Sequence, residues 1–74
     1  MLPYRGMRVC CRDGWAGNLQ SVIVNPETLR PLKLCVLFVH RGQQLICVPA
    51  EYMLATGYDT LHLDITLHQL EQLV

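Results

Sequence analysis

The sequence predicts an all-β protein, a small six-stranded antiparallel barrel with a short C-terminal helix. Short apolar runs recur along the 74 residues, and polar turns separate them at close spacing without intervening helices. Several of these runs are β-branched or alternate apolar with polar residues, as strands do. Closure into a barrel is expected because it removes unpaired strand edges, which an apolar chain would otherwise expose.

The central element is a hairpin over residues 17–39 that turns at residues 25–28. Three β-branched residues precede the turn, and the apolar run 34–39, too short for a typical helix, follows it. Pro26 presets φ for a tight turn, and Asn25 is expected to hydrogen-bond the turn backbone through its side chain. A hairpin this apolar on both faces needs cover from other strands.

The segment before the hairpin divides into a strand and a loop. Residues 7–12 alternate in character and predict a first strand, whereas residues 13–18 contain two glycines and predict a loop. Trp15 is expected at the tip of this loop. There it either covers one end of the core or contacts a partner, since aromatic loop residues often anchor interfaces.

Beyond the hairpin, polar residues 40–43 predict a second turn and residues 44–48 a short strand. Pro49 ends that strand because proline has no N–H to donate to a ladder. Residues 52–55 form a short element of uncertain type. Residues 61–65 alternate strictly, with apolar residues on one face, and predict a half-buried strand.

The last segment changes to a helical period. Thr66 is a favourable N-cap, and Gln69, three residues later, is placed to complete a capping box. The expected apolar stripe of this helix comprises Leu67, Leu70, Leu73 and the neighbouring Val74.

The composition predicts one domain over residues 1–74, with a small core. Hydrophobic residues make up 51% of the chain, which is high for a lone small domain that must expose much of its surface. A homodimer is therefore expected, and a densely packed monomeric barrel is the alternative. The first nine residues have no apolar core typical of a secretory signal, so a cytoplasmic location is expected.

The four cysteines are expected to be reduced and free of metal. Cys10 and Cys11 are adjacent and would point to opposite faces of a strand, while Cys35 and Cys47 lie in apolar runs where a thiol behaves as a small hydrophobe. Disulfides or a zinc site are the alternatives. The zinc alternative lacks the usual CxxC or CxxH spacing.

No catalytic, cofactor-binding or metal-binding residues are predicted. The three histidines, His40, His62 and His68, fall in a turn, on an outer strand face and in a helix, and they are interpreted as scattered surface residues. Asp59 and Asp64 do not form an obvious acid–base pair, and the cysteines lack an evident activating base. The chain is therefore not expected to be an enzyme.

Nucleic acid is an unlikely partner by composition. Six basic and six acidic residues give a formal net charge of zero, whereas phosphate backbones are bound through basic patches. Arg5, Arg8 and Arg12 crowd the N-terminus, and they are interpreted as ordinary solvated charges.

The order and spacing of several short segments resemble the PRC-barrel family. These segments are Gly17-x-x-x-x-Val22-Ile23-Val24-Asn25-Pro26-Glu27-Thr28, Leu34-Cys35-Val36, Val48-Pro49-Ala50-Glu51, Asp59-Thr60-Leu61-His62-Leu63-Asp64 and Thr66-x-x-x-Leu70. The resemblance implies a six-stranded β-barrel with a role in macromolecular assembly, and it brings no catalytic motif. A related barrel in a ribosome-maturation factor implies the alternative of an RNA- or ribosome-associated role.

The sequence thus predicts a non-catalytic, self-associating interaction and assembly module. The candidate interface combines Trp15, the outer side of the central strand and the helix stripe, namely Cys35, Leu37, Val39, Leu67, Leu70 and Leu73. Alternatively, the helix stripe folds back to plug its own barrel end and is not available to a partner.

Overall fold

The computed structural model describes residues 3–40 and 42–73. Its elements are, in order, β1 (Arg8–Cys11), β2 (Gly14–Val24), β3 (Pro31–Phe38), β4 (Gln44–Pro49), the 3₁₀ helix η1 (Ala50–Tyr52), β5 (Met53–Thr56), β6 (Thr60–Leu63) and α1 (Leu67–Glu71). The predicted β-rich fold with a short C-terminal helix is confirmed. The expected second turn and helix stripe also included Arg41 and Val74, which lie outside the described residues.

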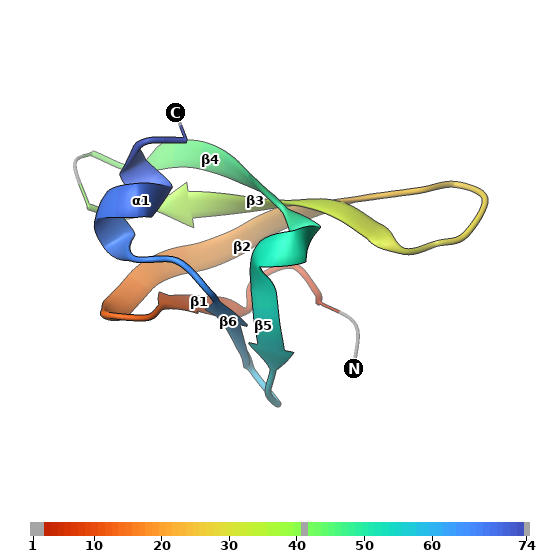
Figure 1. Cartoon of the computed structure of the whole chain (residues 1–74), viewed down its shortest axis with the longest axis horizontal. Coiled ribbons are helices and arrows are strands. Elements are labelled where there is room, and N and C mark those ends of the chain that lie inside the picture. The colour runs from red at the N-terminus through yellow and green to blue at the C-terminus, as the bar shows by residue number, and fades with distance from the viewer. Residues whose placement is uncertain (1–2, 41, 74) are drawn as a thin grey trace.

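The six strands form one curled, mixed sheet in the order β4-β3-β2-β1-β6-β5, a half-barrel rather than a closed antiparallel barrel (Figure 1). The wholly antiparallel prediction is wrong because β1 and β6 run parallel, with Val9 opposite Leu61. An antiparallel barrel would require every pair of neighbouring strands to run in opposite directions. Instead, η1 turns the chain so that the β5–β6 hairpin docks on β1, and no strand of the described residues joins β4 to β5.

The core lies on the concave side of the sheet. Leu34, Val36 and Phe38 of β3 point inward, as the period of two requires. The predicted strand at residues 61–65 is confirmed as far as Leu63, where β6 ends, and the predicted inward residues Leu61, Leu63 and Ile65 are all buried. Helix α1 covers one end of the curl (Figure 1). The buried cluster comprises Met7, Val9, Cys11, Ala16, Leu19, Leu34, Val36, Phe38, Ile46, Val48, Leu61, Leu63, Ile65 and Leu70.

The predicted loop at residues 13–18 is mostly strand, because β2 already begins at Gly14. Trp15 therefore lies within β2, opposite Cys10 of β1, and not at a loop tip. The glycines here do not mark a turn. An ideal Cβ on Gly17, whose φ is 156°, would meet the Leu37 backbone, with the carbonyl carbon at 3.0 Å and its oxygen closer still. Gly17 thus permits a close approach between β2 and β3.

The β2–β3 hairpin turns where the sequence predicts. The Asn25 side-chain Oδ1 accepts hydrogen bonds from the backbone N–H groups of Glu27 (2.8 Å) and Thr28 (3.3 Å). The turn closes through the Leu29 N–H, which donates to the Asn25 carbonyl oxygen at 2.7 Å. Residues 22–33, named the hairpin arm here, project from the half-barrel (Figure 1).

The predicted capping box at the start of α1 is confirmed. The Gln69 N–H donates to Thr66 Oγ1 at 3.1 Å, and the Thr66 N–H donates to Gln69 Oε1 at 2.9 Å. Asp13 adds a third partner, since its Oδ1 accepts from the Leu67 N–H at 2.9 Å. Three N–H groups at the start of the helix are thereby satisfied.

Thr66→Ala is expected to lower the free energy of unfolding by about 1 kcal/mol, because the variant leaves the Gln69 N–H without its cap. Thr66→Ser keeps the hydroxyl and is the matched control, with stability close to that of the parent. Chemical denaturation of all three proteins measures the difference. Coincident curves for Thr66→Ala and the parent would contradict the role of the cap.

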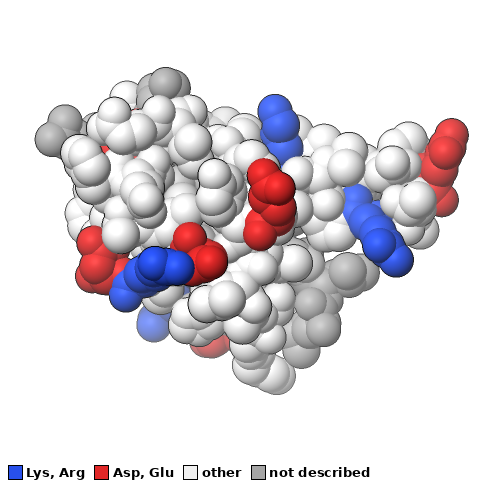
Figure 2. All heavy atoms as spheres, in the orientation of Figure 1, with Lys and Arg blue, Asp and Glu red and all other residues white. Residues whose placement is uncertain are grey.

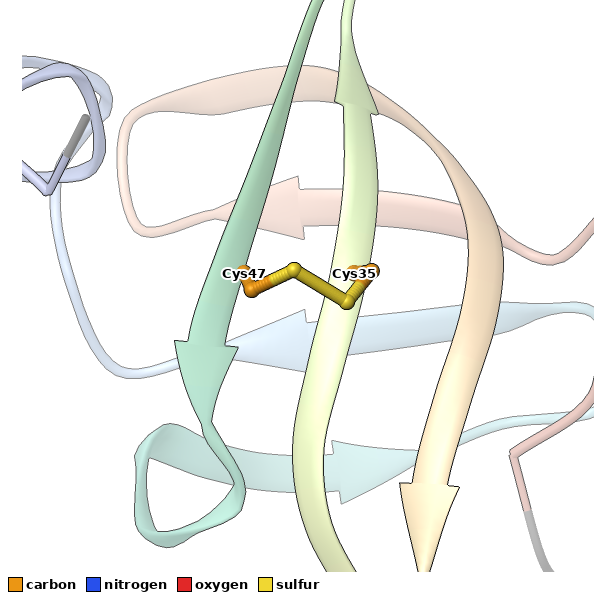
Figure 3. Close-up of a disulfide and its surroundings, with 2 residues drawn as sticks. All are labelled: Cys35 and Cys47. Atoms are coloured by element: carbon orange, nitrogen blue, oxygen red, sulfur yellow. A yellow bond between two sulfur atoms is a disulfide. The ribbon is translucent and has the colours of Figure 1, made fainter.

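Cys35 and Cys47 form a disulfide between β3 and β4 (Figure 3). The prediction that all four cysteines are reduced is therefore wrong for this pair, while Cys10 and Cys11 are free. The physical reason is register: the two residues stand directly opposite each other in the antiparallel ladder. Side chains directly opposite in such a ladder lie close enough for their sulfur atoms to meet.

Candidate interaction surface

Two of the predicted interface residues are buried. Leu70 is 0% exposed and belongs to the core, so the helix stripe plugs the end of its own half-barrel, which was the stated alternative. Leu67 packs against the same core, and Leu73 is exposed. Cys35 is 4% exposed and bonded to Cys47. Leu70 and Cys35 are thus not available to a partner.

The other residues of the central strand contribute to an apolar area on the convex side of the sheet, named the outer patch here. Leu37 is half-buried, and it stands opposite Leu45, which is 55% exposed. The Cys35–Cys47 pair follows two positions along the same face, and the half-buried Val39 lies beyond Leu37. Sequence reasoning missed Leu45 because its partner depends on the register of β3 and β4.

Trp15 is exposed on the convex side of β2. Together with Arg8 it lines a hollow of about 270 Å³. The Trp15 carbonyl oxygen accepts a hydrogen bond from His40 Nε2 at 2.8 Å, and the His40 ring stands 5.2 Å from the Phe38 ring. His40 therefore ties the end of β3 to β2 and has a structural role.

A second hollow, of about 290 Å³, lies beside α1 and is lined by Arg12, Tyr52, Asp64, Ile65, Gln69 and Leu73. Three of its polar side chains, Arg12, Asp64 and Gln69, are already engaged. Arg12 Nε donates to Asp64 Oδ1 at 2.6 Å within an ion pair, and the Gln69 side chain completes the capping box. This hollow therefore offers few free groups for substrate chemistry.

The hairpin arm carries exposed apolar side chains that sequence reasoning did not select. These are Ile23, Val24, Leu29 and Leu32. The arm projects beyond the half-barrel (Figure 1), and Val22 at its base packs against the core. The arm is built from β2 and β3, which have 11 and eight residues, and their length beyond the core is a property of the assembled sheet.

Leu29→Gly is expected to raise the free energy of unfolding by about 0.5–1 kcal/mol. Leu29 has a φ of 60°, which a leucine adopts at a cost, and its side chain is 68% exposed, so little packing is lost. Leu29→Ala is the matched control. It removes the side chain beyond Cβ but keeps the Cβ that makes the positive φ unfavourable. Thermal melts at low protein concentration compare the two, and equal stability of both variants would contradict the argument.

The titratable groups of the described residues were compared with the groupings that bind metal ions. Within residues 3–40 and 42–73, no group of three or more His, Cys, Asp or Glu side chains is placed to hold a metal ion. Burial, with smaller effects of Asp13 and Cys10, raises the pKa of the Cys11 thiol to about 11. Cys11 therefore remains protonated at neutral pH and is a poor nucleophile.

On the face seen in Figure 2, acidic and basic side chains are interspersed, and some of them lie against each other at the lower left. Arg12 and Asp64 form an ion pair. No helix in the described part of the chain is long and apolar enough to span a membrane. The outer patch and the hairpin arm are thus the two distinctive surfaces.

No protein-family model matches this chain, and no curated protein matches it either.

Proposed function

We propose that this chain is a non-catalytic interaction and assembly module that acts as a homodimer. The observation that carries the proposal is the hairpin arm, which projects from the half-barrel and exposes four large apolar side chains. Exposed apolar area of this kind, when contiguous, is typical of protein–protein interfaces. The outer patch, with Leu45 beside Leu37, adds a second apolar area.

Self-association also fits the composition. Hydrophobic residues make up 51% of the 74-residue chain, but a chain of this size has a small interior. The core cluster contains only part of these hydrophobic residues. A two-fold dimer uses the same patch twice and is the commonest assembly of small soluble proteins.

Membership of the PRC-barrel family is part of the same proposal. The curled six-stranded sheet with a short terminal helix is consistent with the barrel that the resemblance implies. An assembly role is what that family would bring, and the exposed apolar surfaces suit it.

The oxidation state of the cysteines bears on the cellular location. A cytoplasmic location is expected from the sequence, yet thiols in that compartment are usually kept reduced. The Cys35–Cys47 disulfide favours a setting in which the pair stays oxidised. The module is therefore proposed to work where its thiols are not continuously reduced.

Light scattering over a concentration series tests self-association directly, and the parent protein is expected to be a dimer at micromolar concentration. Affinity capture, with and without nuclease treatment, tests the alternative role at RNA or the ribosome. Partners that are retained after nuclease treatment support the interaction module. A parent that stays monomeric at high micromolar concentration would end the homodimer proposal.

A further inference from the structure

The two halves of the Cys35–Cys47 disulfide have different surroundings. Cys47 is exposed, whereas Cys35 is only 4% exposed. The difference follows from the places of their strands in the sheet. Among the described residues, β4, which carries Cys47, is an end strand and pairs only with β3, while β3 lies between β4 and β2. Solvent therefore reaches one half of the bond and hardly reaches the other.

The direction of the bond adds to this difference. It runs across the ladder from β3 to β4 (Figure 3). A thiolate displaces a disulfide in line with the S–S bond, so it approaches the attacked sulfur from the side opposite the other sulfur. For Cys47, that side faces the free edge of β4. For Cys35, it faces β2, where Ser21 stands opposite Cys35.

We propose that Cys47 is a site of reversible thiol modification, at which a small external thiol such as glutathione exchanges with the disulfide. The attacking thiolate sulfur forms a new S–S bond to Cys47 Sγ. The electron pair of the Cys35–Cys47 bond leaves on Cys35 Sγ, which takes up a proton from water. The products are a mixed disulfide on Cys47 and a thiol at Cys35, and the reverse reaction releases the external thiol and restores the bond.

Burial of Cys35 affects this exchange in two opposite ways. It disfavours a thiolate leaving at Cys35, because a charged sulfur is poorly solvated there. It also blocks attack on Cys35, so that attack on Cys47 is the route open to the folded protein. Access therefore determines which sulfur is modified, and burial of the leaving sulfur slows the exchange. The Cys35 thiol stays beside the mixed disulfide, where it is placed to reverse the modification.

A group bound to Cys47 lies beside the outer patch. Leu45 precedes Cys47 by two residues on the same face of β4, and Leu37 stands opposite Leu45. The modification also removes the covalent link between β3 and the end strand β4. It thus changes an exposed apolar surface and the attachment of β4 together. The inference does not depend on the proposed self-association.

Exchange with reduced glutathione tests the site in the parent protein. The folded protein is incubated with excess glutathione, the reaction is quenched with acid at early times, and the remaining thiols are alkylated. Trypsin cleavage after Lys33 and Arg41 then places Cys35 and Cys47 in separate peptides. Glutathione is expected on the Cys47 peptide at least about tenfold more often than on the Cys35 peptide. In denaturant both sulfurs are accessible, and the preference is expected to disappear.

Two results of this experiment would overturn the proposal. One is glutathione mainly on the Cys35 peptide, or equally on both peptides, of the folded protein. The other is a folded protein that forms no mixed disulfide and reacts only in denaturant.

Two single variants test the difference in access without the disulfide. Cys47 is a free, exposed thiol in Cys35→Ser, and Cys35 is a free, buried thiol in Cys47→Ser. Oxidised glutathione is expected to modify Cys47 at least about tenfold faster than Cys35. Melts establish that both variants are folded at the assay temperature, and equal rates in the folded variants would contradict the proposal. If either variant is unfolded, the peptide mapping of the parent protein decides.

Discussion

Gly17→Ala is expected to destabilise the fold by about 4 kcal/mol, through a steric clash and an unfavourable backbone conformation together. The added Cβ would overlap the carbonyl group of Leu37, which is backbone and cannot rotate away. Gly17 lies opposite Phe38 in the β2–β3 ladder, so the two strands would have to separate at the centre of the sheet. A domain of this size has a total stability of roughly 4–11 kcal/mol, so this variant is expected to be largely unfolded.

Gly14→Ala is the matched control for Gly17→Ala. Gly14 has nearly the same φ, 157°, but its ideal Cβ meets only a side-chain atom, Leu67 Cδ1, at 3.4 Å. Both variants place a Cβ on a residue with an unfavourable φ, but only Gly17→Ala adds a clash with backbone atoms. Circular dichroism and denaturant titration should show a folded, modestly destabilised Gly14→Ala protein. Equal stability of the two variants would contradict the close strand approach at Gly17.

Features set by neighbouring residues were predictable from the sequence. The alternation of residues 61–65 identifies an inward face because side chains in a strand alternate in direction. The Thr66–Gln69 capping box and the Asn25 turn involve partners within three positions, and the structure contains both. In each case a short-range pattern determines the contact, so no knowledge of the tertiary fold is needed.

Features that depend on distant residues were not predictable in the same way. The parallel pairing of β1 with β6 joins segments about 50 residues apart, and nothing in either strand specifies that direction. Gly17 was interpreted as a loop residue because glycine is common in turns. Its actual role depends on the backbone of Leu37, which approaches only after the strands have paired.

The candidate surface was predicted in part. Residue type and parity place Leu37 on the outer side of β3, where the structure also has it. They do not show that Leu70 fills the end of the half-barrel, since that depends on how α1 folds back. The hairpin arm was missed because the exposure of its side chains depends on how far β2 and β3 extend beyond the core. That length is a property of the assembled sheet.

A shift of one residue in the register of β3 and β4 decides whether Cys35 stands opposite Cys47. The predicted turn at residues 40–43 would pair Cys35 with Val48, whereas the observed register pairs it with Cys47. A one-residue shift also reverses the face on which a side chain lies. Spacing and compartment predict reduced thiols, because neither contains the register that brings the two sulfur atoms together.

Reduction of the Cys35–Cys47 bond is expected to lower the free energy of unfolding by about 3 kcal/mol. The bond links residues separated by 12 positions, and it restricts the unfolded chain over that loop. The double variant Cys35→Ala/Cys47→Ala should lose a similar amount, and added reductant should not change it further. Denaturant titration of both proteins, with and without dithiothreitol, measures these differences.

Cys10→Ala is the matched control, because Cys10 is a free cysteine on the convex side of β1. This variant should retain the full response to dithiothreitol. Titration of thiols in unfolded parent protein should detect two free groups without reductant and four after reduction. Four free thiols before reduction, or melting curves that do not respond to dithiothreitol, would contradict a stabilising bond between β3 and β4.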